Sequence, residues 1–200
     1  MELQTRQKKV SGKPKKLSLE KEIEGIQSSD EKIRARSFSD LYPLSGSNPG
    51  FLYPYWDVFE DMLRSPEITS RYYAIHILSN LASADKGYKF RHIFNLWFYD
   101  LLNHESPVIA PHIAEKSGKI VKAIPTLENK VTPLLLNASR TSACRHPELL
   151  KAYVLAAFET YFPLIPNKEE VIQYIKDQVT STSPTTRNKA KDLIRKFNLS

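Results

Sequence analysis

The sequence predicts an all-α fold, and within that class an α-solenoid, a superhelix of about five antiparallel helix pairs. Three observations lead to this prediction. A helix-start pattern recurs at Ser65, Ser106, His146 and Ser183, and proline follows each time. The segments before and after these starts carry apolar residues at the three- and four-residue spacing of a helix. No segment shows convincing alternation at a period of two, so we expect no sheet.

The interior of the segments repeats more sharply than their starts do. A basic residue is followed three positions later by a small or apolar residue, and four positions after that by a larger apolar one. The copies are Arg34, Ser37 and Leu41; Arg71, Ala74 and Leu78; Lys151, Val154 and Phe158; Arg187, Ala190 and Ile194; and a degenerate copy, Pro111, Ala114 and Gly118. The leading positions 34, 71, 111, 151 and 187 lie 37, 40, 40 and 36 residues apart, which is the period of a two-helix repeat.

Each copy is predicted to be the second helix of a pair. A serine at the N-cap accepts a hydrogen bond from the first turn, and a proline at the first helical position has no N–H to leave unpaired. Ser65-Pro66, Ser106-Pro107 and Ser183-Pro184 fit this rule, and Ser29-Asp30 and His146-Pro147 fit it less well.

The first helix of each pair is an apolar-periodic segment that precedes the copy. The predicted first helices are residues 17–27, 53–64, 88–104, 127–139 and 168–180. Turn-forming residues are expected to separate the pairs at 43–50, 83–87, 124–126 and 163–167. A single pair cannot cover its own apolar face, so the pairs are expected to stack, with polar caps at both ends.

The net charge of +7 is distributed unevenly along the chain. Residues 1–16 hold six basic residues and one acidic residue, a net charge of +5. Residues 17–200 hold 23 basic and 21 acidic residues, a net charge of +2. We therefore expect a disordered basic tail at 1–16 and a nearly neutral solenoid domain at 17–200. The tail suits phosphates, a membrane surface or nuclear import, or serves only solubility.

The sequence favours an intracellular protein. It has no apolar run long enough to span a bilayer and no secretory signal, and its single cysteine, Cys144, is expected to be an inert thiol. The predicted compartment is the cytoplasm, or the nucleus if the host is eukaryotic.

At "IRARSFSDL" (33–41) and "SRYYAIHIL" (70–78) the sequence resembles the second helices of HEAT repeats, within the armadillo and HEAT-like solenoids. The resemblance covers about residues 17–200 and implies a scaffold or adaptor that binds proteins. HEAT-like DNA glycosylases are an enzymatic alternative, and they imply a catalytic aspartate with tryptophans in a basic groove. Here Trp56 and Trp97 fall on first helices, where core packing is expected, and Asp192 lies in the terminal cap.

Second helices usually line the concave side of such arrays, so we expect binding residues at the offsets that face away from the core. Two positions after each leading residue, the helices place a row of aromatics between cations, which suits a peptide or nucleic acid. The alternative is an ordinary solvated face with some tyrosines half-buried between repeats. The candidate partner-binding residues are Arg36, Tyr73, His76, Lys116, Lys119, Tyr153 and Lys189.

The leading basic residues invite two interpretations. They form either a phosphate-binding ladder or, because they lie beside the apolar stripe, an internal ladder bonded to carboxylates and carbonyls of neighbouring segments. In the third repeat, Pro111 and Gly118 replace the cation and the large apolar residue. They predict either a hinge near 107–120 or a helix that starts late, with Pro111 in its first turn.

The sequence contains no recognisable catalytic constellation, phosphate loop or metal-binding pattern, so we expect a non-enzymatic protein without cofactor or metal. The predicted function is a scaffold that binds a protein or peptide on its concave face. The alternative is a nucleic-acid-binding protein, either glycosylase-like or an accessory factor, that uses the tail and the concave cations.

Overall fold

The computed structural model describes residues 18–86 and 88–199, and within them the chain is helical and contains no strand. The predicted tail, residues 1–16, lies outside the described residues. No helix in this part of the chain has both the length and the apolarity needed to cross a bilayer.

The described helices are grouped here as first and second helices in chain order, and the prediction of an all-helical chain is confirmed for the described residues. The first helices are α1 (Leu19–Gly25); α3 (Pro49–Leu52), η1 (Tyr53–Tyr55) and α4 (Trp56–Met62) in series; α6 (Phe90–Asn95) with the π-helical η2 (Leu96–Leu101); α8 (Glu128–Thr141); and α10 (Glu169–Asp177) with η5 (Gln178–Thr180). The second helices are α2 (Glu31–Ser47), α5 (Ile68–Leu81), α7 (Ile109–Ala123), α9 (Pro147–Tyr161) and α11 (Pro184–Phe197). Short 3-10 turns, η3 (Pro125–Leu127) and η4 (Phe162–Leu164), join the later pairs.

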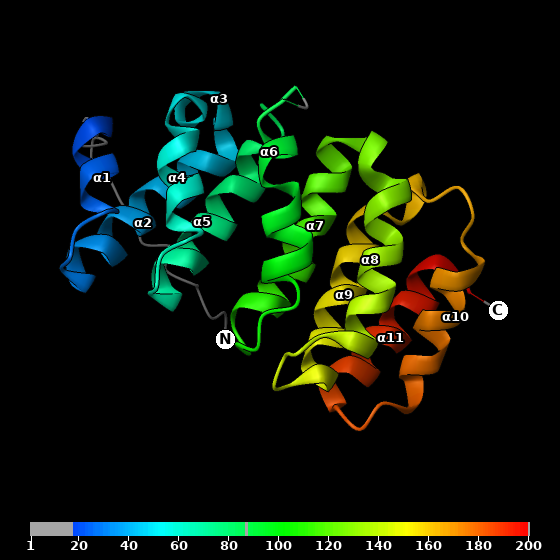
Figure 1. Cartoon of the computed structure of the whole chain (residues 1–200). Helices are drawn as coiled ribbons and strands as arrows, with labels where there is room; N and C mark the ends of the chain where they lie inside the picture. The colour runs from blue at the N-terminus through cyan, green and yellow to red at the C-terminus, as the bar shows by residue number, and fades with distance from the viewer. Residues whose placement is uncertain (1–17, 87, 200) are drawn as a thin grey trace, which may run out of the picture.

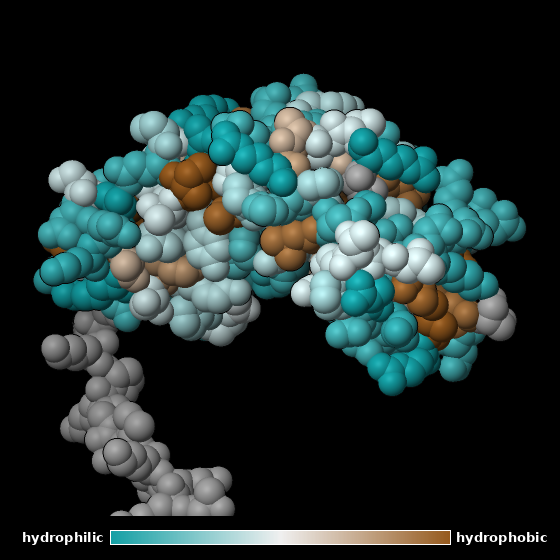
Figure 2. Space-filling model, turned by 90° about the horizontal axis from the view of Figure 1, so that it is seen from below, coloured by the Kyte–Doolittle hydropathy of each residue, from teal (hydrophilic) through white to brown (hydrophobic). Residues whose placement is uncertain are grey.

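Each second helix packs against its own first helix and against the second helices on either side, in the order α2, α5, α7, α9, α11 (Figure 1). The contact between α7 and α9 is the most extensive. In Figure 1, α8 and α10 lie in front of α9 and α11. Seen from below, the chain is an arch whose hollow edge is on the side of the second helices (Figure 2).

Buried apolar side chains form one continuous core along the stack. Trp56 and Trp97 are fully buried in it, which confirms that both tryptophans are packing residues. The indole N–H of Trp97 donates to Ser117 Oγ at 3.1 Å, so this large side chain is buried without an unpaired donor.

The predicted serine caps are confirmed in part. Ser183 is the N-cap of α11, and its hydroxyl accepts from the backbone N–H of Thr186. Ser106 Oγ accepts from the N–H groups of Val108 and Ile109 just before and at the start of α7. Neither Ser65 nor Ser106 is an N-cap, because α5 begins only at Ile68 and α7 only at Ile109, each three residues later.

The predicted turn at 43–50 contains the boundary between the first two pairs, but the break is confined to Asn48. Helix α2 continues through Pro43 to Ser47, and α3 begins two residues later at Pro49. A tertiary contact holds this last turn, because the buried Ser45 accepts a hydrogen bond from Asn80 of α5 at 2.8 Å. The local tendency of proline to end a helix is therefore overcome by packing.

The third pair agrees with the late-start alternative rather than with a hinge. Pro111 lies in the first turn of α7, where its missing N–H would have no intrahelical partner anyway. Gly118 lies against the backbone of α9, so it serves close packing of two helices.

Candidate functional site: an aromatic band on the second helices

The leading arginines are internal, as the second interpretation of the ladder predicted. Arg34, Arg71 and Arg187 each donate to the carbonyl of the residue six positions earlier, which is a serine in every case. Each arginine thereby holds the turn between the two helices of its pair.

Two of these arginines also reach the next pair. Arg34 forms an ion pair with Glu67, and an N–H of the Arg71 guanidinium donates to His104 Nε2 at 2.9 Å. Burial and the nearby Arg71 lower the pKa of His104 below its ordinary value. These side chains are committed to the fold and are not free to bind phosphates.

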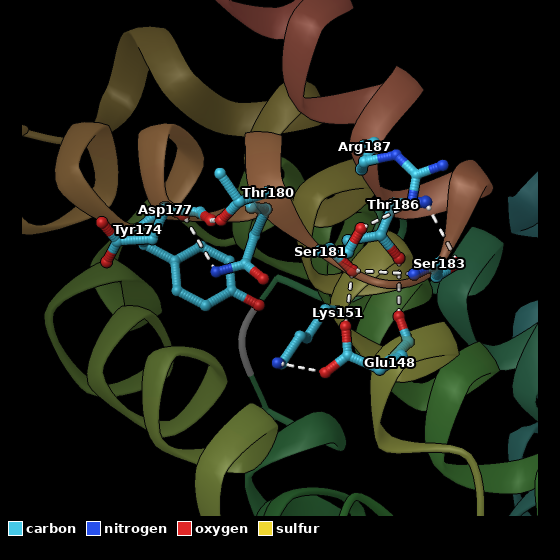
Figure 3. A network of polar contacts seen from close by, with 10 residues as sticks. Glu148, Lys151, Tyr174, Asp177, Thr180, Ser181, Ser183, Thr186 and Arg187 are labelled. Atoms are coloured by element: carbon cyan, nitrogen blue, oxygen red, sulfur yellow. Dashed lines mark hydrogen bonds and ion pairs between the residues drawn. The ribbon is translucent and has the colours of Figure 1, made fainter.

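The last two pairs are joined by a polar network around Glu148 at the start of α9 (Figure 3). Its carboxylate accepts from Ser181 Oγ and Lys151 Nζ, and its backbone carbonyl accepts from Thr186 Oγ1 at 2.6 Å. The hydrogen bonds from Lys151 and Ser181 lower the pKa of Glu148. Lys151, the fourth leading residue, therefore also acts within the stack.

Arg36 and Lys189, which lie at the two ends of the predicted row, are both paired with carboxylates. Arg36 forms an ion pair with Glu22 at 3.4 Å, and Lys189 forms one with Glu159, which also binds Lys196. Both end residues of the row are therefore engaged by carboxylates, although at the α11 end Glu159 is shared by two lysines.

The structure corrects the expectation that these helix positions face away from the core. His76 and Lys116 are each only 6% exposed, and Ile113 is fully buried. The reason is the close side-by-side packing of the second helices, which covers His76 with the rings of Tyr42, Tyr72 and His112.

Four of the candidate residues do lie near one another, in the middle of the stack. Tyr73 and His76 come from α5, Lys116 from α7 and Tyr153 from α9. Rings that the sequence analysis did not select connect them. Together they form what we call the aromatic band: Phe38, Tyr42, Tyr72, Tyr73, His76, His112 and Tyr153.

The band runs continuously from α2 to α9. Phe38 stacks on Tyr73 with ring centroids 4.2 Å apart, and Tyr72 lies at the same distance from His76. His112 then contacts Tyr72 at 4.9 Å and Tyr153 at 5.2 Å. All the rings except His76 are half-buried, so the band presents part of each ring to the surface.

The centre of the band is electrostatically unusual. Neither ring nitrogen of the buried His76 has a hydrogen-bond partner within the described structure. Burial, with a smaller contribution from Lys116, lowers the pKa of His76 to about 3, so the ring is neutral at physiological pH.

A carboxylate on α7 balances the cations beside His76. Glu115 lies 3.5 Å from His112 Nδ1 and 3.1 Å from Lys116 Nζ. These contacts, led by that with His112, lower the pKa of Glu115 to about 2, so it is ionised at neutral pH. The band therefore combines apolar rings with a compensated charge pair rather than with a free cationic surface.

Lys119 lies one turn further along α7 and joins three helices. Its Nζ donates to Asn80 Oδ1 at 2.7 Å, and Asn80 in turn donates to Ser45 of α2. Burial lowers the pKa of Lys119. Of the candidate cations, Lys119 is the one held by a neutral partner.

The residues of the band provide rings and hydrogen-bonding groups but no recognisable catalytic arrangement. Among the described residues, no group of three or more His, Cys, Asp or Glu side chains is placed to hold a metal ion. Cys144 is buried, with Sγ 3.9 Å from the Ser106 carbonyl oxygen.

No protein-family model matches the chain, and neither a curated protein nor a solved structure matches it.

Proposed function

We propose that residues 17–200 form a HEAT-like α-solenoid that acts as a non-enzymatic interaction module and binds a partner protein on the face of its second helices. The side-by-side order of α2, α5, α7, α9 and α11 and the hollow on that side support the proposal (Figure 2). The proposed ligand is a peptide segment of the partner.

The aromatic band is the observation that carries this proposal. Half-buried tyrosines offer large, rigid contact surfaces that also hydrogen-bond, which is why tyrosine is enriched in protein interfaces and among their energetically dominant residues. The band holds four tyrosines and spans four helices that lie side by side. Such a surface suits apolar and aromatic side chains of a partner.

The charge distribution supports a protein partner over a nucleic acid. Nucleic-acid grooves need cations that are free to neutralise phosphates. Arg36 and Lys189 are paired with carboxylates, and Lys116 is buried beside Glu115. The buried Trp56 and Trp97 are also not available to line a glycosylase-like groove.

The dimensions of the band suggest the size of the segment. Packed helices lie about 8–10 Å apart, so three spacings from α2 to α9 cover roughly 24–30 Å. An extended chain rises about 3.3 Å per residue, so a segment of roughly eight residues would cross the band.

A random peptide library displayed on phage, selected on the full-length protein, tests the proposal. We expect enrichment of peptides rich in apolar and aromatic residues. Their affinity should fall at least about tenfold in the variant Tyr42→Ala/Tyr153→Ala, because it removes two rings from opposite ends of the band. The variant Tyr99→Ala, at an exposed position on η2, is the matched control.

Equal loss of affinity in both variants, or in neither, would contradict a binding site on the band. Nucleic acid is tested separately, by fluorescence anisotropy with single- and double-stranded DNA and RNA at two salt concentrations. Steeply salt-dependent binding that survives removal of residues 1–16 would favour the nucleic-acid alternative.

A further inference from the structure

A pocket of about 500 Å³ lies away from the aromatic band, between α6 and the turn that leads into α8. In Figure 1, α6 and the turn that connects α7 to α8 both lie in the upper part of the picture. The pocket is lined by Phe90, Arg91, Phe94, Asn95, Ile124, Thr126, Leu127 and Lys130. None of these residues belongs to α2, α5, α9 or α11, so the pocket is separate from the band.

One side of the pocket is apolar and already ordered. Phe90 is buried, and Phe94 packs against the buried Phe98 with ring centroids 4.8 Å apart. Ile124 and Leu127 are half-buried on the opposite side. The pocket thus exposes apolar surface on two sides, and its volume falls in the range of sites that hold a bulky side chain or a small ligand.

The charged part of the lining is entirely positive. Arg91 and Lys130 are both exposed and come from different helices, α6 and α8. Within the described residues neither makes an ion pair, whereas Arg34, Lys89 and Lys189 all have carboxylate partners. Two uncompensated cations beside an apolar wall complement an anion that carries an apolar body.

We propose that this pocket binds an acidic and aromatic peptide segment, in which an aromatic side chain enters between Phe94 and Leu127 while flanking carboxylates contact Arg91 and Lys130. The volume accommodates one aromatic side chain with adjacent backbone. Asn95 and Thr126 supply polar groups for that backbone. The proposal does not depend on the aromatic band, because the two sites share no residue.

The probe is the peptide acetyl-Glu-Phe-Glu-amide, titrated into the uniformly ¹⁵N-labelled full-length protein while amide chemical shifts are followed. We expect saturable shifts confined to residues 90–95 and 124–130. Acetyl-Lys-Phe-Lys-amide, which reverses the charge, and acetyl-Glu-Ala-Glu-amide, which lacks the ring, should each bind at least about tenfold more weakly.

The variant Arg91→Glu/Lys130→Glu should lose the shifts caused by the acidic peptide and gain affinity for the lysine peptide. The variant Arg140→Glu/Lys191→Glu changes the net charge equally at exposed positions outside the pocket, and should behave as the original protein. Absence of shifts with acetyl-Glu-Phe-Glu-amide, equal shifts with all three peptides, or shifts located on the band would overturn the proposal.

Discussion

Gly118 of α7 lies against Ala157 of α9 with no space for a side chain. A methyl group at position 118 would stand 2.7 Å from the Ala157 carbonyl oxygen and 2.9 Å from its Cα. Because backbone atoms of a packed helix cannot move aside alone, this glycine determines how closely the two helices approach.

Gly118→Ala should destabilise the protein. Alanine favours the helix by roughly 1 kcal/mol over glycine, but overpacking at a helix contact costs about 1–3 kcal/mol, so we expect a net loss. Gly46→Ala is the matched control, since the nearest atom to its added methyl group, Asn80 Nδ2, is 3.7 Å away. Urea unfolding measures both. Equal stability of the two variants would show that α9 can shift to accommodate the added methyl group, which would contradict the prediction.

Arg34→Ala should weaken the junction between the first two pairs. The Arg34 guanidinium, nearly buried, donates to the carbonyls of Ser28 and Ser29 and pairs with Glu67. Hydrogen bonds from charged groups contribute about 1.5–3 kcal/mol, so a loss of roughly 2–3 kcal/mol in the free energy of unfolding is expected.

The exposed pair of Arg64 with Glu60 supplies the control for this prediction. Arg64→Ala should change stability by less than about 1 kcal/mol, because exposed ion pairs contribute little. Arg34→Lys should recover only part of the loss, since one ammonium cannot replace the planar fork of donors. An Arg34→Ala variant as stable as Arg64→Ala would refute the structural role of the ladder.

The sequence was sufficient to predict the all-helical fold and the internal role of Arg34, Arg71 and Arg187. Both depend on local periodicity, and the serine six residues before each arginine was an additional signal that the sequence analysis did not use. The cap at Ser183 is similarly local.

The burial of His76 could not be predicted in this way. Helical offsets give the direction of a side chain relative to its own helix, but the exposure of His76 depends on how closely α2 and α7 pack beside α5. A partial signal for the band was present, because Phe38 with Tyr42 and Tyr72 with His76 are both ring pairs four residues apart on consecutive second helices.

Thr186→Val should loosen the junction between α9 and α11. The Thr186 hydroxyl is fully buried and donates to the Glu148 carbonyl oxygen, whereas valine keeps the shape without the donor. Loss of one buried hydrogen bond costs about 1–2 kcal/mol. Thr185→Val, one residue earlier and exposed, should be neutral within about 0.5 kcal/mol. Thermal unfolding of both variants checks this prediction, and indistinguishable midpoints would contradict it.

His76 should make the protein less stable as the pH falls below neutrality. The unfolded chain takes up a proton at this side chain near pH 6.5, but the folded chain does so only near a pKa of about 3, because burial and Lys116 disfavour the charged ring. Protonation between these values therefore stabilises the unfolded state. The free energy of unfolding should fall by up to about 1.4 kcal/mol per pH unit from this group alone.

Urea unfolding between about pH 7.5 and pH 5 measures this effect without a contribution from Glu115, whose lowered pKa matters only below its ordinary value of 4.5. His76→Phe and His76→Gln both remove the titrating group, one with an apolar ring and one with a polar amide. Whatever their absolute stabilities, both variants should show the same decrease in the slope of unfolding free energy against pH. The slope that remains should include the contribution of His104, whose pKa is also lowered. If both variants keep the full slope of the original protein, His76 is already accessible to protons in the folded state, and the centre of the band is then open to solvent rather than sealed by its neighbouring rings.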